Sequence, residues 1–156
     1  MHLRAFLILL SALTAVPAGF CQNDGLRVEL TADRHEVPNL EKFSVSAKII
    51  NAGLQDQPIQ IWLCSYYESW VVDNPFVTMD PWACSKNPLQ KIVLKPGEVY
   101  ENTSFPLILS VGVPVEEILQ DSVTFRLGFK RDILNAQDIE QPLVWSEPLT
   151  IQITEK

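Results

Sequence analysis

The sequence predicts an all-β fold, built as a two-layer antiparallel β-sandwich. Short stretches in which apolar and polar residues alternate recur along the chain, which is the pattern of half-buried strands. Pro, Gly and Asn separate these stretches, and such residues favour turns. Alternation alone does not distinguish two packed sheets from a closed sheet, so a barrel of similar size is the alternative.

Three strands are expected in the first half of the domain. They cover residues 26–31, 43–49 and 59–63, each with apolar residues at every second position. The second strand ends at the turn Asn51-Ala52-Gly53, and the third runs into Cys64. We expect one face of each strand to be buried and the other to be solvated.

The middle of the chain contains two further expected strands. Ile92 and Leu94 precede the turn Lys95-Pro96-Gly97-Glu98, in which proline fixes φ and glycine permits a positive φ. Residues 104–110 form the second strand. Pro106 confines that strand to a sheet edge or a bulge, because proline has no N–H to donate.

The last third of the chain combines strands with the single expected helix. The clearest alternation runs from Ser122 to Lys130 and predicts one continuous strand. Residues 149–154 predict a final strand. Residues 114–120 predict a helix of one or two turns, because proline stands at the start and two glutamates follow in the first turn.

The N-terminus has the features of a secretory signal peptide, assigned to residues 1–21. A short basic start precedes the apolar run Ala5–Val16 and small residues. We expect cleavage after Ala18 or after Cys21. A lipid anchor on Cys21 ranks third, because the bulky Phe20 precedes that cysteine.

This leader predicts that residues 22–156 form one β-sandwich domain that is secreted or periplasmic. The apolar run is shorter than the roughly 20 residues that a spanning helix needs. No second run of that length follows it, so no transmembrane segment is expected after removal of the signal.

The charge balance narrows the classes of partner. The chain has 12 Lys and Arg against 19 Asp and Glu, with a formal net charge of −7. It contains no cluster of basic residues, so we expect no binding to nucleic acid.

Three segments carry a family resemblance. They are Phe43-Ser44-Val45-Ser46-Ala47-Lys48-Ile49-Ile50-Asn51, Pro58-Ile59-Gln60-Ile61 and Leu94-Lys95-Pro96-Gly97-Glu98. Their order resembles secreted bacterial immunoglobulin-like domains, and it is partly similar to the bacterial intracellular proteinase inhibitor family. The resemblance implies an immunoglobulin-like two-sheet sandwich. An export signal departs from an intracellular inhibitor, so the resemblance does not carry inhibitory activity with it.

Cys64 and Cys84 are predicted to form a disulfide bond. In an exported chain, two cysteines that enclose one loop are more often bonded than free. Closing a loop of this length contributes roughly 3 kcal/mol in the chain-entropy model. The bond would hold a long excursion between two strands at its base.

The enclosed segment is rich in aromatic residues, for which two interpretations remain open. The candidate binding residues are Tyr66, Tyr67, Trp70, Phe76 and Trp82. They could form an exposed platform for a protein partner or a polysaccharide. Alternatively, residues 70–72 and 76–78 form a hairpin around Asp73-Asn74-Pro75 whose apolar face covers the core. We favour the second interpretation, because large aromatic side chains are usually well buried.

Neither a metal site nor a catalytic site is predicted. Asp73, Asn74 and Asp80 lack the alternating spacing of a calcium loop. His35 is the only histidine after the signal peptide, so a blue-copper site lacks its ligands. A catalytic triad would have to use the same residue, which lies in a polar turn. We expect no cofactor and no enzymatic activity.

These observations predict a non-enzymatic exported binding module of the cell envelope or extracellular space, with an unknown protein or polysaccharide as its partner. An inhibitor of a secreted or periplasmic protease is the first alternative. A structural accessory domain without its own ligand is the second.

Overall fold

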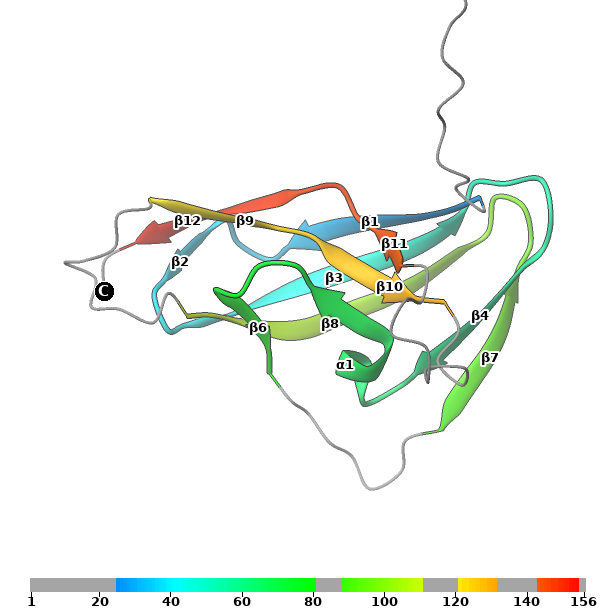
Figure 1. The fold of residues 1–156 in the computed structure, drawn as a ribbon, viewed down its shortest axis with the longest axis horizontal. Coiled ribbons are helices and arrows are strands. Elements are labelled where there is room, and N and C mark those ends of the chain that lie inside the picture. The colour runs from blue at the N-terminus through cyan, green and yellow to red at the C-terminus, as the bar shows by residue number, and fades with distance from the viewer. Residues whose placement is uncertain (1–24, 81–87, 111–120, 132–142, 155–156) are drawn as a thin grey trace, which may run out of the picture.

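A computed structural model describes residues 25–80, 88–110, 121–131 and 143–154, which form an all-β fold with one short helix (Figure 1). The elements are β1 (Leu26–Ala32), β2 (Glu36–Pro38), β3 (Lys42–Asn51), β4 (Gln57–Trp62), α1 (Tyr66–Ser69), β5 (Trp70–Val72), β6 (Val77–Met79), β7 (Leu89–Leu94), β8 (Val99–Leu109), β9 (Ser122–Phe125), β10 (Leu127–Lys130), β11 (Leu143–Trp145) and β12 (Leu149–Thr154). The predicted signal peptide, residues 1–21, and the predicted helix, residues 114–120, lie outside the described residues.

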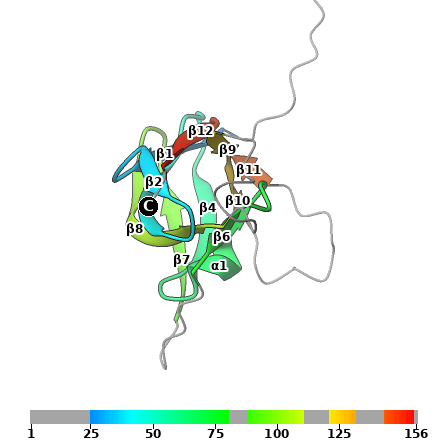
Figure 2. The same cartoon turned by 90° about the vertical axis from the view of Figure 1, so that its left-hand side faces the viewer.

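The strands form several sheets, in which most neighbours are antiparallel. Their orders are β1-β3-β8-β6, β11-β10-β5, β2-β12-β9 and β4-β7. Within the described residues, β2 and β12 are the one parallel pair of named strands. The end-on view places β8 and β10 on opposite sides of the molecule (Figure 2). This arrangement is compatible with a β-sandwich.

The core fills the space between these strands. Val45, Ala47 and Ile49 alternate along β3 with more exposed residues, and all three are buried. Phe43 on β3 contacts Phe125 on β9 edge to face, with ring centroids 6.0 Å apart. Because β3 and β9 belong to different sheets, this contact joins two sheets across the core.

Several predicted strands are confirmed, and one is wrong. The alternation at residues 26–31, 43–49, 59–63 and 149–154 corresponds to β1, β3, β4 and β12. The predicted continuous strand 122–130 is divided at Arg126. β9 pairs with β12, whereas β10 pairs with β5 and β11, so the chain passes from one sheet to another at this residue.

Pro106 lies on β8, between β3 and β6 rather than at an edge. It stands opposite Ser44, next to a register shift between Val45 and Ala47 of β3. Its carbonyl accepts a hydrogen bond from the Asp80 N–H at 3.1 Å. The N and C=O of one residue point to the same side of a strand, so the ring nitrogen of Pro106 also faces β6, where the Asp80 carbonyl accepts from the Tyr66 hydroxyl instead. The edge expectation is wrong, and the register shift between β3 and β8 lies beside Pro106 rather than at it.

Asn51, at the end of β3, joins several segments at one end of the molecule. Its side chain is fully buried. The amide nitrogen donates to the carbonyls of Gln55 and Leu94, both at 2.8 Å, and the amide oxygen accepts from the Gly53 N–H at 3.0 Å. Its backbone groups bond the turn between β7 and β8. All hydrogen-bonding capacity of the amide nitrogen is therefore used.

Leu40 occupies a tight turn between β2 and β3 that the sequence did not indicate. The Glu41 N–H donates to the Pro38 carbonyl at 3.1 Å and closes the turn. Leu40 has a φ of 64° and is 64% exposed. A branched apolar side chain in this left-handed region costs about 1–2 kcal/mol relative to ordinary backbone.

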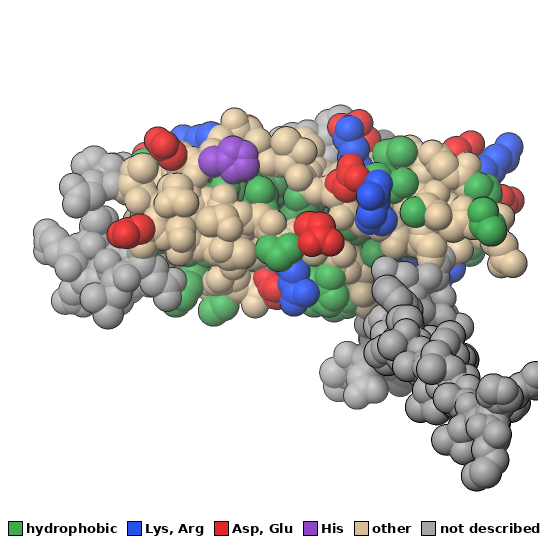
Figure 3. Space-filling model, turned by 90° about the horizontal axis from the view of Figure 1, so that it is seen from above, with side chains coloured by type: hydrophobic (Ala, Val, Ile, Leu, Met, Phe, Trp, Pro, Cys, Tyr) green, Lys and Arg blue, Asp and Glu red, His purple; other side chains and the backbone are tan. Residues whose placement is uncertain are grey.

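Figure 3 shows charged side chains of both signs interspersed with small apolar areas on one face. Across the described part of the chain, no helix has the length and apolar character that crossing a membrane requires.

We predict that Asn51→Ala destabilises the fold by about 2–4 kcal/mol, because it leaves the buried Leu94 carbonyl and the partly buried Gly53 N–H without this partner. Urea unfolding monitored by circular dichroism measures the change. Gln90→Ala, which removes an exposed amide from β7, should change stability by less than about 0.5 kcal/mol. Equal losses of stability from the two substitutions would show that the Asn51 hydrogen bonds do not contribute more than an exposed side chain does.

We predict that Leu40→Gly stabilises the protein by about 0.5–1 kcal/mol, because glycine adopts a positive φ without steric cost. Thermal unfolding measures the effect. Leu54→Gly is the matched control, since Leu54 is 95% exposed and does not have a positive φ. A gain from both substitutions, or from neither, would contradict backbone strain at Leu40.

Candidate functional site

The segment between β4 and β7, residues 63–88, is called the excursion, and the structure describes all of it except residues 81–87. It contains α1, β5 and β6. The predicted hairpin is wrong: β5 pairs with β10, and β6 pairs with β8. Figure 1 shows the chain leaving α1, arching over and descending through β6. Each arm of the arch therefore extends a different sheet.

Local hydrogen bonds fix the start of the excursion. The Trp62 N–H donates to the Ser69 hydroxyl at 3.0 Å, and Ser69 is fully buried. The Glu68 N–H donates to the Ser65 carbonyl at 2.9 Å, and the Trp70 N–H donates to the Tyr66 carbonyl. These contacts hold α1 against the end of β4, so that β5 begins in a defined place.

The structure divides the predicted aromatic residues between core and surface. Trp70 is 1% exposed and Tyr66 is 7% exposed, whereas Tyr67 is 37% exposed. Phe76 is partly buried and packs against the core. Trp82 lies outside the described residues. Of the four described aromatics, Tyr67 is thus the one that a partner can reach readily.

Trp70 is held by a neighbour on the adjacent strand. It stands directly opposite Phe129 of β10, and the two ring centroids are 5.1 Å apart. With 1% of its surface exposed, Trp70 offers a ligand almost no contact area. Its role here is to anchor the excursion rather than to meet a partner.

Tyr66 anchors the other end of the described excursion. Its hydroxyl donates to the Asp80 carbonyl at 2.5 Å. Burial, with a smaller contribution from the Asp80 charge, raises the pKa of Tyr66. Tyr66 therefore stays protonated and serves as a hydrogen-bond donor.

An open groove of about 530 Å³ lies along the arch. Its lining comes from one continuous part of the excursion: Tyr67, Trp70, Val71, Val72, Asp73, Asn74, Pro75, Val77, Thr78 and Met79. Both arms, β5 and β6, border it, and Tyr67 contributes an exposed aromatic ring. We refer to this feature as the groove.

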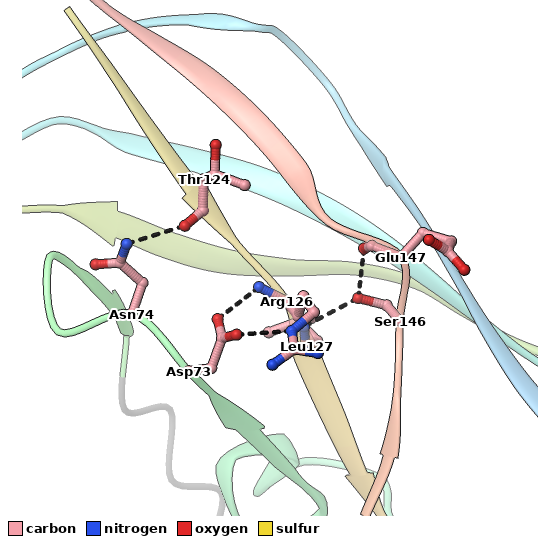
Figure 4. Close-up of polar contacts among 7 residues, drawn as sticks. All are labelled: Asp73, Asn74, Thr124, Arg126, Leu127, Ser146 and Glu147. Atoms are coloured by element: carbon pink, nitrogen blue, oxygen red, sulfur yellow. Dashed lines mark hydrogen bonds and ion pairs between the residues drawn. The ribbon is translucent and has the colours of Figure 1, made fainter. Parts of the chain in front are cut away.

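Asp73 ties the arch to the place where β9 becomes β10 (Figure 4). Its carboxylate accepts from the Arg126 backbone N–H at 2.7 Å and from the Arg126 Nε at 2.8 Å. The Asp73 N–H donates to the Arg126 carbonyl at 3.3 Å. Two of these bonds satisfy the Arg126 backbone N–H and C=O, which the sheet change removes from the β9 pairing, and the third joins the two side chains.

Asn74 fixes the arch beside this junction. Its Nδ2 donates to the Thr124 carbonyl at 2.9 Å (Figure 4). Its Oδ1 accepts from the Phe76 N–H at 2.9 Å. The Asn74 carbonyl accepts from the Val77 N–H at 3.1 Å. The arch therefore has a defined shape where it turns from β5 into β6.

Ser146 holds the other side of the sheet change. Its hydroxyl accepts from the Leu127 N–H at 3.1 Å and donates to the Glu147 carbonyl at 2.9 Å (Figure 4). Trp145, just before it, covers Gly128, where an added Cβ would lie 2.9 Å from the ring. The Arg126 guanidinium lies 5.0 Å from the centroid of the Trp145 ring. The signal for this close approach of Trp145 to the backbone is Gly128 itself, a glycine inside an alternating strand pattern.

The Arg126 contacts also determine the ionisation of Asp73. Partial burial alone would raise the pKa of Asp73. The hydrogen bonds and charge of Arg126 outweigh burial, so the pKa of Asp73 is lowered overall. Asp73 is therefore ionised at neutral pH and acts as an acceptor.

The sequence offered His35 for catalysis or copper binding and three residues of the excursion for calcium binding. His35 is exposed in the turn before β2, and its carbonyl accepts from the Gln152 N–H. Within the ranges that the structure describes, no group of three or more His, Cys, Asp and Glu side chains is placed to hold a metal ion. Cys64 is half-buried just after β4, and Cys84 lies outside the described residues, so their pairing stays a prediction.

Comparisons with known proteins show likeness of structure only. No protein-family model matches the chain, and no curated protein matches it. It is similar to the structure described as FixG-related protein from Vibrio parahaemolyticus, with 14% identity and a TM-score of 0.44 over 83% of this chain and 97% of that chain. It is also similar to Spo0M, sporulation control protein, from Bacillus subtilis, with 11% identity and a TM-score of 0.49 over 85% of this chain and 50% of that chain. Neither likeness carries an argument about function.

We predict that Asp73→Asn destabilises the protein at pH 7 and that the difference from wild type shrinks in acid. Because the folded-state pKa of Asp73 is lowered, the carboxylate stabilises the fold above the ordinary carboxyl pKa of about 3.9. That contribution is lost as pH falls through the lowered folded-state pKa. Urea unfolding of both proteins at neutral and acidic pH measures it.

Asp56→Asn, at an exposed position before β4, is the control for general charge effects. A difference between wild type and Asp73→Asn that stays constant with pH would contradict the stabilising role of the ionised carboxylate.

Proposed function

We propose that this chain is a non-enzymatic, exported binding module with an immunoglobulin-like two-sheet sandwich, and that the groove on the excursion is its contact surface. The exposed ring of Tyr67 beside a groove of about 530 Å³ carries this proposal. Tyrosine combines a large apolar surface with a hydroxyl, and it is enriched in residues that dominate binding energy.

The rigidity of the surrounding residues supports this assignment. Trp70 packs within the core, and Asp73 and Asn74 bond the backbone of the β9–β10 region. A surface that is already ordered loses little conformational entropy when a partner binds. The sandwich would thus present a preformed loop, as such scaffolds often do.

A disulfide bond between Cys64 and Cys84 belongs to this proposal. Trp62 of β4 pairs with Leu89 of β7, so the two ends of the excursion start from neighbouring strands. A bond between the cysteines would close the excursion near its base. The predicted export signal supports an oxidising compartment in which such a bond persists.

The partner is proposed to be a protein or polysaccharide of the cell envelope or extracellular space. No cofactor is needed for this role, since binding would use the groove and its rim alone.

Inhibition of a secreted or periplasmic protease is a second candidate, favoured by the turn that presents Leu40. This leucine is exposed on backbone fixed by hydrogen bonds from the Leu40 and Glu41 N–H groups. A fixed, exposed leucine can act as a substrate mimic. Assays against a panel of secreted proteases at micromolar protein test this candidate, and inhibition that Leu40→Gly abolishes would support it.

We predict that Tyr67→Ala weakens partner capture at least about fivefold, the loss typical of an interface contact worth 1 kcal/mol or more, with little change in stability. Immobilised protein is exposed to extracellular and envelope fractions of the source cells, and bound protein and carbohydrate are quantified. Trp70→Ala should instead destabilise the fold by about 3–5 kcal/mol, because it leaves a large cavity in the core.

Val93→Ala is the matched surface control, since Val93 is exposed on β7 and does not line the groove. Capture by Tyr67→Ala equal to that by Val93→Ala would exclude the groove as the contact surface. No capture by the wild-type protein from either fraction would contradict a binding function.

A further inference from the structure

Strand β6 forms one wall of the groove and, among the strands that the structure describes, lies at the edge of the sheet β1-β3-β8-β6. Its pairing with β8 fixes the direction of its backbone groups. The Ser110 N–H donates to the Phe76 carbonyl, and the Asp80 N–H donates to the Pro106 carbonyl. In an antiparallel ladder every second residue bonds the partner strand. Residues 76, 78 and 80 therefore face β8, and the residues between them face away.

Val77 and Met79 thus direct their backbone groups away from β8. The Val77 N–H bonds the Asn74 carbonyl within the arch. The Val77 carbonyl and both backbone groups of Met79 then lie along the outer edge of β6, where a further strand would form its ladder. Thr78, between them, is exposed, and both Thr78 and Met79 line the groove.

The outer edge of β5 is less suitable for such pairing. The Asp73 N–H bonds the Arg126 carbonyl, so Val71 faces β10 and Trp70 and Val72 face outward. The Trp70 N–H already bonds α1. β5 therefore serves as the opposite wall, and β6 is the edge that can accept a strand.

The charges around the groove favour a positively charged partner. The chain has no Lys, Arg or His from residue 49 to residue 85, whereas Asp56, Glu68, Asp73 and Asp80 lie in this stretch. Arg126 pairs with Asp73 and Lys42 pairs with Asp80. Among the described residues, this leaves Glu68, beside Tyr67, and Asp56, before β4, without an ion pair. Together with the net charge of −7, this acidity favours a partner that carries Lys or Arg.

We propose that the groove binds an extended peptide segment of a basic partner protein, which adds to the outer edge of β6 as a strand. The peptide backbone bonds Met79 and the Val77 carbonyl, side chains on one face of the peptide enter the groove beside Tyr67, and a Lys or Arg lies near Glu68. This inference rests on the proposed function and narrows its partner to a peptide.

The probe is a displayed library of random nine-residue peptides, screened against the intact mature protein. Selected peptides are synthesised with a fluorescent label, and their dissociation constants are measured by anisotropy. We expect them to be enriched in Lys or Arg and to lack proline at the centre. N-methylation along the peptide should weaken binding at every second position by at least fivefold, because only alternate N–H groups face β6.

Met79→Pro tests the same edge from the protein side. It removes an N–H that does not bond β8, and its ring would obstruct an added strand. We expect at least a tenfold loss of affinity, whereas Met79→Leu, which retains the N–H and a similar volume, should remain within twofold of wild type. Glu68→Lys should weaken binding severalfold and reduce its dependence on salt.

The outcomes separate this inference from the proposed function. Strand addition is wrong if Tyr67→Ala abolishes capture of a polysaccharide. It is also wrong if N-methylation does not weaken peptide binding at every second position. Both results leave the proposed binding function intact. If Met79→Pro fails to fold, the binding of the N-methylated peptides to the wild-type protein still tests strand addition. A dimer of this chain that Met79→Pro disrupts, with no peptide selected, would show that a second copy is the occupant and would overturn the proposal.

Discussion

The hydrogen bonds between Asp73 and Arg126 join segments that lie 53 residues apart in the chain. At Arg126 the chain leaves one sheet and enters another, so a strand neighbour no longer satisfies its backbone N–H as it would inside a ladder. The Asp73 carboxylate accepts from this N–H and from the guanidinium of the same residue. The change of sheet thus becomes tolerable, and the arch of the excursion gains a fixed position. The β5 wall of the groove leads directly into this junction, whereas the β6 wall is held by its pairing with β8.

Sequence periodicity predicted the strands whose side chains alternate, such as β1, β3 and β12, because burial of one face acts locally on every second residue. It could not predict the break at Arg126. Phe125 and Leu127 are both buried although they belong to different sheets, so the alternation continues through the break. The alternation of side chains indicates which face of a strand is buried. It does not indicate which strand pairs with it, because that depends on residues far away in the sequence. The positive φ of Leu40 was equally hidden, since leucine is not a residue that favours it.

The composition of the excursion identified the candidate site, but not the division of its aromatic residues. Trp70 and Tyr67 are both large aromatics near each other in the sequence. Trp70 is buried because Phe129 stands opposite it on β10, and Tyr67 is exposed because it occupies the outward side of α1. The hairpin expectation was wrong for a related reason: each arm joins a strand of an existing sheet, whereas an isolated two-stranded hairpin is only marginally stable in water.

The parallel pairing of β2 with β12 has a consequence for biosynthesis. β12 lies between β2 and β9, and Ile151 at its centre is fully buried. Residues 36–38 therefore wait for partners at residues 152–154, which are synthesised much later, and such distant pairings form slowly. A nascent chain cannot complete this sheet or seal its core before residue 149 has been synthesised. For a chain proposed to cross a membrane in an unfolded form, this order keeps the domain competent for translocation until β12 has been synthesised.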